Sequence, residues 1–326
     1  MPLLIDKKKH IESISIVICT YNRAKILKET LESYLTLCRP IEFKIELLIV
    51  DNNSNDETLQ MVDQFMQHHP EVRYVFEPEP GLSYARNTGV KESRGDIIIY
   101  VDDDVYFDSN WLVEVGRIFK EYPDASCMGG RIIPVFETGK PDWITDDLLT
   151  PYGLTNSGDI IKWMLYPEYP FGGNMAFKRT VFDKIDMFNP NLGRKKKNLL
   201  SNEENEIFWR VSQAGLRVIY NPMALLYHRI PSERTCKEWL LARYYWQGIS
   251  SIVFDQLIAP QSRLVLLKRS IRDGWLLLRQ STGMLWLPRK AYWHYKATKF
   301  PEKCSQSYKL GIVKQMFIES ISFKKN

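Results

Sequence analysis

Three consecutive aspartates, Asp102, Asp103 and Asp104, are the residues of this chain best suited to chemistry. They follow the run Asp96–Val101, whose β-branched residues predict a buried strand. Carboxylates at the C-terminal end of a parallel strand lie in the crevice where open α/β sheets bind ligands. Because three carboxylates repel one another, we expect a hard divalent cation there, Mn²⁺ or Mg²⁺, that carries a substrate diphosphate. The structural alternative is an acidic, solvated turn.

Polar residues also end the first two expected strands. Thr20, Tyr21, Asn22 and Arg23 follow the first strand, and Asp51 ends the second. These strand ends should face the same crevice as the aspartates. An aromatic ring such as that of Tyr21 can stack on a nucleotide base, and Asp51 can accept a hydrogen bond from a base N–H group. Asn, Asp and Ser also favour turns and helix caps, so each segment alone is a weak signal.

A glycine turn precedes the strand that carries the aspartates. Gly81 opens an expected helix, Ser83–Lys91, whose first turn offers backbone N–H groups to phosphate. Arg86 would add a fixed cation to a donor site, and Asn87 a neutral hydrogen-bond donor. The alternative is an ordinary helix start with a solvated arginine, and the glycine spacing does not decide between them.

Strand and helix patterns alternate through the first half of the chain, which predicts a parallel, Rossmann-like α/β sheet with right-handed crossovers. The expected strands are Ile14–Cys19, Ile45–Asp51, Val72–Phe76 and Asp96–Val101, and the helices between them are Ala24–Leu37, Asp56–His68 and Ser83–Lys91. Ser54 and Glu57 have capping-box spacing at the start of the second helix. Residues 132–170 resemble an irregular region. The later segments Phe171–Lys178, Leu216–Asn221 and Ala224–His228 would complete the sheet, with a helix at Glu203–Ala214.

Composition and charge describe a folded protein with an uneven charge distribution. The chain has 326 residues, 44% hydrophobic and 25% charged, which suits one large α/β domain and an appendage. Residues 1–230 hold 27 basic and 33 acidic residues, a net charge of −6, whereas residues 231–326 hold 17 and 6, a net charge of +11. We therefore expect a catalytic domain over residues 1–230 and a basic, helical extension over residues 231–326.

The cysteine pattern and the hydropathy of the chain indicate its cellular location. Five dispersed cysteines without CxxC spacing argue for reduced thiols and against a disulfide framework or a zinc site. The N-terminus lacks the apolar core of a signal peptide, and no stretch reaches the ~18 apolar residues that a membrane span needs. We expect a cytoplasmic protein, peripheral on the cytoplasmic face of the membrane where the basic extension binds it.

Taken together, the motifs resemble glycosyltransferase family 2. The resemblance rests on Thr-Tyr-Asn-Arg after the first strand, Val-Asp-Asn-Asn-Ser at the end of the second, Gly-Leu-Ser-Tyr-Ala-Arg-Asn, and the strand ending in Asp-Asp-Asp. It covers roughly residues 13–230 and implies the GT-A fold, which binds nucleotide-diphosphate sugars. Within the family the chain is most similar to the subgroup of hormogonium polysaccharide biosynthesis glycosyltransferases.

The resemblance implies roles for the strand-end residues. Thr20, Tyr21 and Asn22 match the nucleotide-binding segment of the family, and Asp51 matches its base-recognising acid. We group Arg23, Arg86 and Asn87 with them as donor-binding candidates.

The resemblance also implies a metal site. Asp102 and Asp104 match the ends of the family's Asp-x-Asp motif, in which the last acid meets the metal and the first lies nearer the ribose. Asp103, the middle residue, is a donor-binding candidate, and the triple aspartate leaves the register of the motif open. His228 ends an apolar run at a place where the family often has a metal or phosphate ligand. A structural histidine is the equal alternative.

Two further blocks match the family. The segment Phe171–Phe177 resembles its glycine-rich strand beside the sugar, which makes Gly173 and Asn174 donor-binding candidates; a bulged strand is the alternative. The helix start at Glu203 and Glu204 matches the family's Gly-Glu-Asp-x-Glu motif, although here Asn replaces Gly and Glu204 replaces the Asp that usually serves as catalytic base. The choice between the two glutamates therefore stays open, and acidic residues also favour helix N-termini.

A lysine-rich loop, Gly193–Lys197, precedes these glutamates. It could be a lid, a contact for an acidic acceptor such as a lipid diphosphate, or a solvated turn.

The basic extension has an amphipathic pattern. An apolar stripe at helical spacing, flanked by basic residues, is typical of membrane-surface helices. The alternative is a helical appendage packed on the catalytic domain. The stripe is Leu264, Leu267, Ile271, Trp275 and Leu278, flanked by Lys268, Arg269, Arg272 and Arg279, and aromatic residues follow at Trp286, Tyr292, Trp293 and Tyr295. We expect an anionic membrane surface as a partner, and no nucleic acid.

These features predict a metal-dependent, inverting glycosyltransferase that moves a sugar from a nucleotide-diphosphate donor to a hydroxyl of a glycan or lipid-linked acceptor in polysaccharide biosynthesis. Glu204, or Glu203, would be the base. A sugar nucleotidyltransferase should instead carry a glycine-rich phosphate loop after the first strand, where this chain has Thr20-Tyr21-Asn22-Arg23. A non-catalytic member that binds membranes or partners is the second alternative, and donor hydrolysis would distinguish it. The sequence does not identify the sugar, the nucleotide, the acceptor or the oligomeric state.

Overall fold

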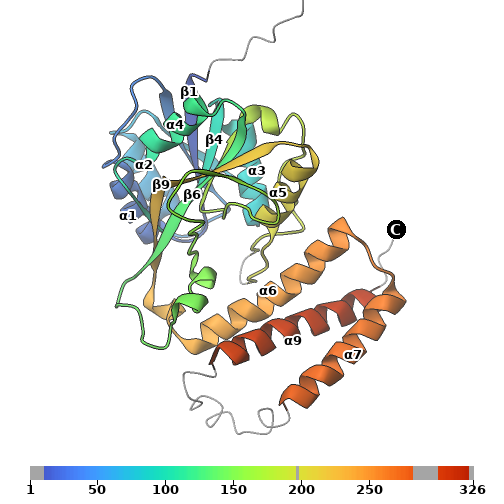
Figure 1. Ribbon diagram of the computed structural model, residues 1–326. Coiled ribbons are helices and arrows are strands. Elements are labelled where there is room, and N and C mark those ends of the chain that lie inside the picture. Colours follow the sequence, from blue (N-terminus) through green and yellow to red (C-terminus); the bar gives the residue numbers. More distant parts are fainter. Residues whose placement is uncertain (1–10, 196–197, 282–299, 323–326) are drawn as a thin grey trace, which may run out of the picture.

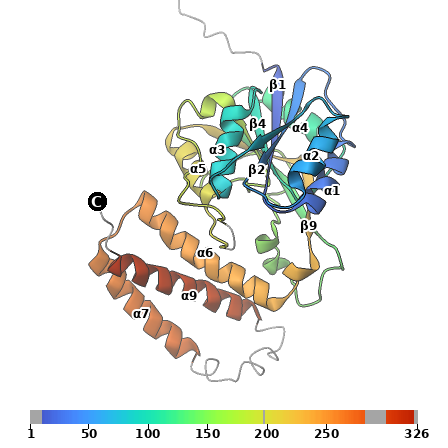
Figure 2. The same cartoon turned by 180° about the vertical axis from the view of Figure 1, so that it is seen from behind.

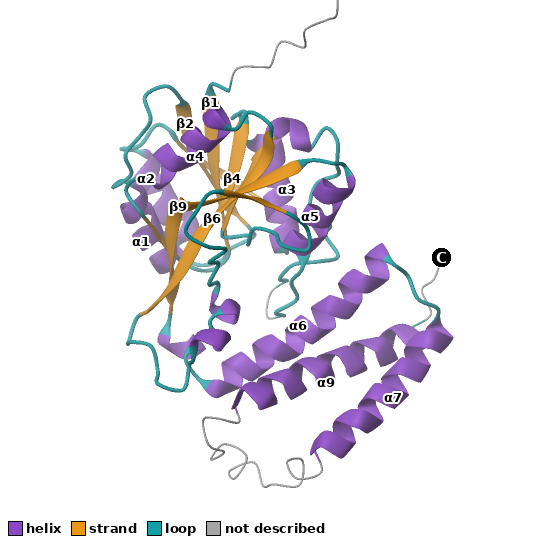
Figure 3. Cartoon of the chain, viewed as in Figure 1, coloured by secondary structure: helices purple, strands orange, loops and turns teal. Residues whose placement is uncertain are grey.

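The computed structural model describes residues 11–195, 198–281 and 300–322. A mixed sheet with helices on both faces forms one part of the molecule, and three long helices lie side by side against one end of it (Figure 1). The sheet has nine strands in the order β3-β2-β1-β4-β8-β6-β9-β5, and β7 pairs with β9. Figure 3 shows that the strands are confined to the first part, whereas the second is helical.

The first half of the chain forms the parallel half of the sheet, as the alternating pattern predicted. Strands β1 (Ser13–Thr20), β2 (Lys44–Asp51), β3 (Val72–Phe76) and β4 (Ile97–Asp102) alternate with helices α1 (Ala24–Tyr34), α2 (Thr58–Met66) and α3 (Leu82–Glu92). In the register, Thr20 lies opposite Asp51, and Cys19 lies opposite Asp102. The polar residues that end these strands are thus brought to one edge of the sheet.

Burial on both faces explains the continuous apolar runs in these strands. Ile14, Ile16 and Ile18 of β1 pack in one hydrophobic cluster, and Val17 packs in a second cluster on the other face. All four side chains are fully buried. The central strands are therefore anchored from both sides, which fixes the strand ends that carry polar residues.

The second half of the sheet differs from the predicted pattern. The sequence pattern predicted no element at β5 (Val105–Phe107) or α4 (Trp111–Glu121), and it predicted an irregular region over residues 132–170. That region holds the end of β6 (Ala125–Phe136), two short 3₁₀ turns and β7 (Lys162–Met164). Strand β8 (Asn174–Lys178) runs antiparallel between β4 and β6.

Two predicted strands are one long strand, β9 (Arg217–Ile230). Its pairing with β6 shifts register between Gly130 and Arg131, whose partners are Asn221 and Leu225. This irregularity lies where the sequence suggested a break. The predicted capping box does not form: the N-cap residue of α2 is Glu57, which makes no side-chain cap hydrogen bond. Asp56, one residue earlier, accepts hydrogen bonds from the Thr58 N–H and hydroxyl groups.

The extension consists of α6 (Lys237–Ile258), α7 (Arg263–Ser281) and α9 (Phe300–Ile321). Helix α6 lies between the sheet part and α9, and α7 is outermost, in both views (Figures 1 and 2). None of the helices in the described ranges is long and apolar enough to cross a membrane. The predicted aromatic residues from Trp286 to Tyr295 lie outside the described residues.

Candidate active site

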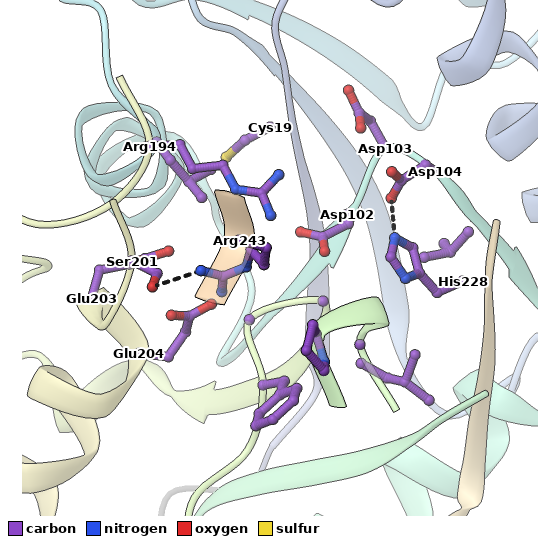
Figure 4. A pocket seen from close by; sticks show the side chains of 18 of the residues that line it. Cys19, Asp102, Asp103, Asp104, Arg194, Ser201, Glu203, Glu204, His228 and Arg243 are labelled. Atoms are coloured by element: carbon purple, nitrogen blue, oxygen red, sulfur yellow. Dashed lines mark hydrogen bonds and ion pairs between the residues drawn. The ribbon is translucent and has the colours of Figure 1, made fainter. Parts of the chain in front are cut away.

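A pocket of about 690 Å³ opens at the C-terminal ends of β1 and β4, and α6 closes one side of it (Figure 4). It collects residues that are far apart in the sequence. Of the candidates named from the sequence, those that line it are Thr20, Tyr21, Arg23, Arg86, Asp102, Asp103, Asp104, Gly173, Glu203, Glu204 and His228. Four candidates, Asn22, Asp51, Asn87 and Asn174, are not among its lining residues.

At one end of the pocket, Asp104 and His228 face each other, with 3.3 Å between Asp104 Oδ1 and His228 Nε2. His228 Nδ1 lies 2.6 Å from the Tyr152 carbonyl oxygen, which can only accept a hydrogen bond, so Nδ1 carries a proton. The lone pair of a neutral imidazole at Nε2 would then point at a carboxylate. Such an arrangement requires a proton or a cation between the two groups, and this donor set fits a divalent metal.

Electrostatics favour a charged Asp104. Burial alone would raise the pKa of the Asp104 carboxyl, but His228, Arg23 and Arg234 hold it well below its usual range. Burial opposes protonation of His228, whereas the Asp104 carboxylate outweighs burial and raises the pKa of the imidazole. Within the described residues, no group of three or more His, Cys, Asp or Glu side chains converges as a metal-binding set. A metal here would therefore need oxygen ligands from a substrate.

Asp103 lines the pocket, but its carboxylate is bonded within the protein, and its donor-binding role stays a prediction. Its carboxylate accepts hydrogen bonds from the Thr20 hydroxyl, at 2.7 Å, and from Arg23. Arg23 also pairs with Asp104 at 2.8 Å. Asp103 lies in the turn between β4 and β5, and its carboxylate is directed at the end of β1. Thr20 and Arg23 are thereby committed to fixing the aspartate segment.

Asp102 lies in the pocket beside the glycine-rich segment that leads into β8. It forms no hydrogen bond or ion pair with any described residue of the chain, and a Cβ atom at Gly173 would come within 2.7 Å of its Oδ2 atom. A side chain at position 173 would thus fill the space in front of Asp102. The glycine keeps this carboxylate open to the pocket, as the sequence pattern suggested for a close approach of substrate.

At the other end of the pocket, Glu203 and Glu204 begin α5 (Glu203–Gln213) with different exposures. The Glu203 side chain is 3% exposed and pairs with Arg86 at 3.0 Å, whereas Glu204 is 21% exposed and lies 3.7 Å from Arg86. Burial and the neighbouring Glu204 raise the pKa of Glu203 to about 7, and Arg86 opposes this rise. Glu204 is thus the carboxylate that faces the pocket, which favours it over Glu203 as a base.

Arg86 was predicted to bind the donor, which stays a prediction; in this structure it lines the pocket and pairs with acidic side chains. It is 2% exposed and neutralises the two glutamates instead of offering a free cation to a phosphate. A Cβ atom at Gly172 would lie 2.2 Å from Arg86 Nη2 and 2.4 Å from Glu204 Oε1. The first glycine of the Gly172-Gly173 pair therefore makes room for the Arg86–Glu204 contact, and the second makes room for Asp102.

Asn87 and Asn174 were predicted to bind the donor; in this structure both amides bond within the protein, and donor binding by them stays a prediction. The Asn87 amide exchanges two 2.8 Å hydrogen bonds with the Phe188 backbone. Asn174 is fully buried; its amide accepts a hydrogen bond from Trp111 Nε1 and donates to two backbone carbonyl groups. Both amides have the partners that buried polar groups need, so each holds the fold together.

Asp51 and Asn22 lie at the edge of the strand ends without lining the pocket. Asp51 is 2% exposed and accepts hydrogen bonds from the Ser54 N–H group and the Tyr74 hydroxyl. Asn22, at a φ of +53°, accepts a hydrogen bond from the Asn55 N–H group. In this structure both residues fasten the loop after β2 to the loop after β1.

Residues of α6 and its entry line the pocket, and the sequence analysis did not find them. They are Arg234, Trp239, Arg243, Tyr244 and Gln247. Their side chains approach the pocket only after the extension folds back on the sheet part. One indication of an unusual local structure nearby was present in the sequence: Asn202, which contacts α6, stands where the family motif usually has a glycine. Asn202 has a φ of +76°, a conformation that Gly adopts freely and Asn tolerates.

Helix α6 also holds the segment in front of the glutamates. Gln247 Nε2 donates to Asn202 Oδ1 at 2.9 Å, and the Ser201 N–H group donates to Ser250 Oγ at 3.0 Å. Arg243 Nη1 lies 3.4 Å from the Ser201 hydroxyl oxygen. The position of Glu204 therefore depends on the extension.

The fold and the pocket define a class of protein, the GT-A glycosyltransferases: a sheet with parallel strands at its centre, acidic residues after β4, and a glutamate pair at the start of α5. Solved structures of this kind resemble the chain. A mannosyltransferase from Pyrobaculum calidifontis in complex with GDP-Man and Mn²⁺ matches with a TM-score of 0.59 at 16% identity, over 97% of this chain and 89% of that one. GalNAc-T7 with UDP, GalNAc and Mn²⁺ matches with a TM-score of 0.53 at 18% identity, over 74% and 51%.

The chain belongs to glycosyl transferase family 2, whose family model matches residues 15–186. A relative in Haloferax volcanii, a glucosyl-dolichyl phosphate glucuronosyltransferase, is 31% identical over 76% of this chain and 79% of its own length. The predicted family and fold are thus confirmed, and the protein is a glycosyltransferase. The narrower resemblance to hormogonium polysaccharide enzymes stays a prediction.

Proposed function

We propose that this protein is a metal-dependent, inverting glycosyltransferase that moves a sugar from a nucleotide-diphosphate donor to a hydroxyl group of a glycan or lipid-linked acceptor. The observation that carries the proposal is the placement of Glu204 and the Asp104–His228 pair at opposite ends of one pocket. One end suits a metal and a diphosphate, and the other suits a base. The sugar would lie between them, beside Gly172 and Gly173.

At the donor end, Asp104 and His228 would hold Mn²⁺ or Mg²⁺, with Asp102 facing the same space. When bound, the ion neutralises charge on the leaving diphosphate. Tyr21, which is 40% exposed at the pocket edge, is available to stack on the nucleotide base. Two solved neighbours in complex with Mn²⁺ and a nucleotide or nucleotide sugar are consistent with this arrangement.

At the acceptor end, Glu204 would take the proton of the attacking hydroxyl. The acceptor oxygen forms a bond to the anomeric carbon, the bond from that carbon to the diphosphate oxygen breaks, and its electron pair leaves with the diphosphate. Attack from the face opposite the leaving group inverts the anomeric carbon. Arg86 and Glu203, buried behind Glu204, would keep its carboxylate directed into the pocket.

The acceptor class is suggested by the relatives. The Haloferax volcanii relative is named for transfer to a glucosyl-dolichyl phosphate, and the chain spans 79% of its length. We propose the same general class here, a glycan or lipid-linked acceptor in polysaccharide or glycolipid synthesis.

We also propose that residues 1–230 form the catalytic domain and that residues 231–326 form an extension that binds an anionic membrane surface from the cytoplasmic side. Exposed apolar residues on α7 and α9 support the proposed membrane contact. Their exposed fractions lie between 47% and 64% at Leu264, Ile271, Leu310, Phe317 and Ile321. The net charge of +11 over the extension complements anionic lipid.

A ligand screen with purified protein tests the proposed reaction. We expect one nucleotide sugar from a panel to raise the melting temperature only in the presence of Mn²⁺ or Mg²⁺. That donor should then be hydrolysed slowly, with the released sugar of opposite anomeric configuration by NMR. Stabilisation by no nucleotide sugar, or release with retained configuration, would contradict the proposal.

A further inference from the structure

Arg243 is a buried cation in the pocket that no carboxylate neutralises directly. Its Nη1 atom lies 3.4 Å from the Ser201 hydroxyl oxygen, and its Nε atom is buried without any hydrogen-bond partner. Among the described residues, no Asp or Glu side chain lies within salt-bridge distance of its guanidinium group. A buried guanidinium with open donors is costly unless a ligand supplies the acceptor.

A second arginine lies close by. Arg194 lines the same pocket and, in the described part of the chain, also forms no ion pair. Figure 4 shows Arg194 and Arg243 on the side of Asp102 that faces Glu203 and Glu204. Burial, followed by repulsion from Arg194, lowers the pKa of Arg243 to about 10. Two guanidinium groups that repel each other in a pocket form a site for an oxyanion, because their planar donors match phosphate oxygens.

The place of Arg243 distinguishes it from the cations at the donor diphosphate. The diphosphate would lie at Asp104 and His228, where Arg23 and Arg234 are the nearby cations, at 2.8 Å and 3.4 Å from Asp104. Arg194 lies between the two ends, because it repels both Arg234 and Arg243. Arg243 instead flanks the base, because it contacts Ser201, two residues before Glu203. Any acceptor whose hydroxyl reaches Glu204 must pass close to Arg243.

We propose that the acceptor carries a phosphate group and that Arg194 and Arg243 bind it. The inference rests on the proposed function, since it takes Glu204 as the base that marks the acceptor end. It narrows the acceptor from glycan or lipid-linked molecules to those with a phosphate near the hydroxyl that is glycosylated. It also gives the extension a substrate-binding role, because Arg243 belongs to α6.

Calorimetry on the full-length protein tests this proposal without knowledge of the sugars. Hexyl phosphate is titrated into protein that is saturated with Mn²⁺ and UDP or GDP, so that the donor end is filled. We expect hexyl phosphate to bind the complex, Arg243→Gln to weaken this binding at least tenfold, and Arg243→Lys to retain part of it. Nucleotide affinity should not change. Arg272→Gln, which removes the same charge from the outer helix α7, is the matched control and should bind as the natural protein does.

Other outcomes would overturn the inference. Competition between hexyl phosphate and the nucleotide, or an equal loss of nucleotide affinity in Arg243→Gln, would assign Arg243 to the donor. Heptanoate binding as tightly as hexyl phosphate would make the ligand a carboxylate, and inorganic phosphate binding as tightly would point to a free anion. If neither UDP nor GDP binds with Mn²⁺, the proposed function fails, whereas hexyl phosphate binding through Arg243 remains measurable by itself.

Discussion

Neighbouring glutamates in this protein have the same chemistry and opposite environments. Glu203 is buried against Arg86, and Glu204 keeps a fifth of its side chain open to the pocket. Sequence comparison leaves their roles open, because a family motif with one substituted position fits either residue. Exposure favours Glu204 as the proposed base, since a base must touch the proton that it removes.

Substitution of each glutamate separates the base from its support. We expect Glu204→Gln to lower kcat by roughly 10²-fold or more, because loss of a general base removes that much rate, with donor binding nearly unchanged. Glu203→Gln should cause a smaller loss of kcat and lower the melting temperature, because it leaves the buried Arg86 with a weaker partner. Steady-state kinetics and donor titration measure both effects. A larger kcat loss in Glu203→Gln would reverse the assignment.

Glu203 should also leave a mark on the pH dependence of stability. The pKa of its carboxyl is about 7 in the folded protein, above the ordinary value of 4.5. Between these two values the folded state holds a proton that the unfolded state has lost, so the free energy of unfolding falls as pH rises through this window. In Glu203→Gln this part of the fall should be missing. Urea unfolding of both proteins from pH 4 to 8 checks the difference, and equal slopes would contradict it.

Asp104 provides a test of the metal site that does not depend on turnover. Asp104→Asn keeps the size of the side chain but removes the charge that faces His228. We expect Mn²⁺ affinity, measured by calorimetry with UDP or GDP present, to fall at least tenfold. Asp63→Asn, an exposed position on α2, is the control and should leave Mn²⁺ affinity unchanged. Unaltered Mn²⁺ binding by Asp104→Asn would remove this residue from the site.

At the scale of elements, the contact between α6 and α9 is important for the pocket, because α6 lines one side of it and packs against α9. Gly248 of α6 and Gly311 of α9 let the two backbones meet: a Cβ atom at either position would lie 2.0 Å from a carbonyl oxygen of the partner helix. Helix α6 in turn holds the Ser201–Asn202 segment. The extension therefore contributes contacts to the pocket wall, and the division at residue 230 into a catalytic domain and an extension stays a prediction.

A single methyl group tests this helix contact. Gly311→Ala must push α9 away from the Tyr245 carbonyl group, and overpacking of this kind costs about 1–3 kcal/mol. Gly274→Ala on α7 is the matched control, because its Cβ atom would find its nearest neighbour at 3.4 Å. The control should be neutral or slightly stabilising, since Ala favours helix. Thermal unfolding compares the two, and equal melting temperatures would argue against a tight α6–α9 contact.

How much of the fold could be predicted differs between its halves. The parallel strands β1 to β4 were found because both their faces are buried, which produces continuous β-branched runs. Strand β6 was missed because Gly129, Gly130 and Pro134 interrupt its apolar pattern. A glycine is needed in this strand because residues remote in sequence pack closely against it: a Cβ atom at Gly130 would collide with Asn174 and the Ala224 carbonyl oxygen.

The site was predictable to a similar degree. Carboxylates and histidine at strand ends were found, because strand direction alone brings them to one edge. The backbone partners of Asn87 and Asn174 could not be predicted, because an amide beside a glycine motif fits a substrate or a backbone group equally well. Arg243 was missed because its approach to Ser201 depends on how α6 folds back over the sheet.

For the whole molecule, the charge division and the extension suggest an orientation on a surface. On α7, four exposed apolar residues, Leu264, Ile271, Trp275 and Leu278, follow one stripe that contains Lys268, and Val265 and Leu276 are exposed beside it. On α9, Leu310, Phe317 and Ile321 form a similar stripe that contains Lys314. Apolar stripes with lysines suit the interface of an anionic bilayer, where the stems lie in the apolar region and the ammonium groups reach the lipid phosphates.

Sedimentation with vesicles tests this orientation. The full-length protein should bind vesicles that contain anionic lipid, and raised ionic strength should weaken the binding without abolishing it, because salt screens the lysines but not the apolar stripe. Lys268→Ser should cost about fivefold in affinity at low salt, since one basic residue near such a surface contributes about 1 kcal/mol. Ile271→Ser should weaken binding at low and high salt alike. Ile41→Ser, at a fully exposed site of the sheet part, is the control and should bind normally.

Point variants are preferable to truncation after Pro260, because removal of α9 would uncover the face of α6 that holds Gly248 and would disturb the pocket. Full-length protein that ignores anionic vesicles at low salt would make the extension a purely structural wall of the active site. Binding that Lys268→Ser reduces and Ile271→Ser does not would limit the contact to charge. We expect both variants to lose vesicle affinity, Lys268→Ser mainly at low salt and Ile271→Ser at low and high salt alike. This is the result expected of a helix face that lies in the bilayer interface and keeps the pocket close to a lipid-linked acceptor.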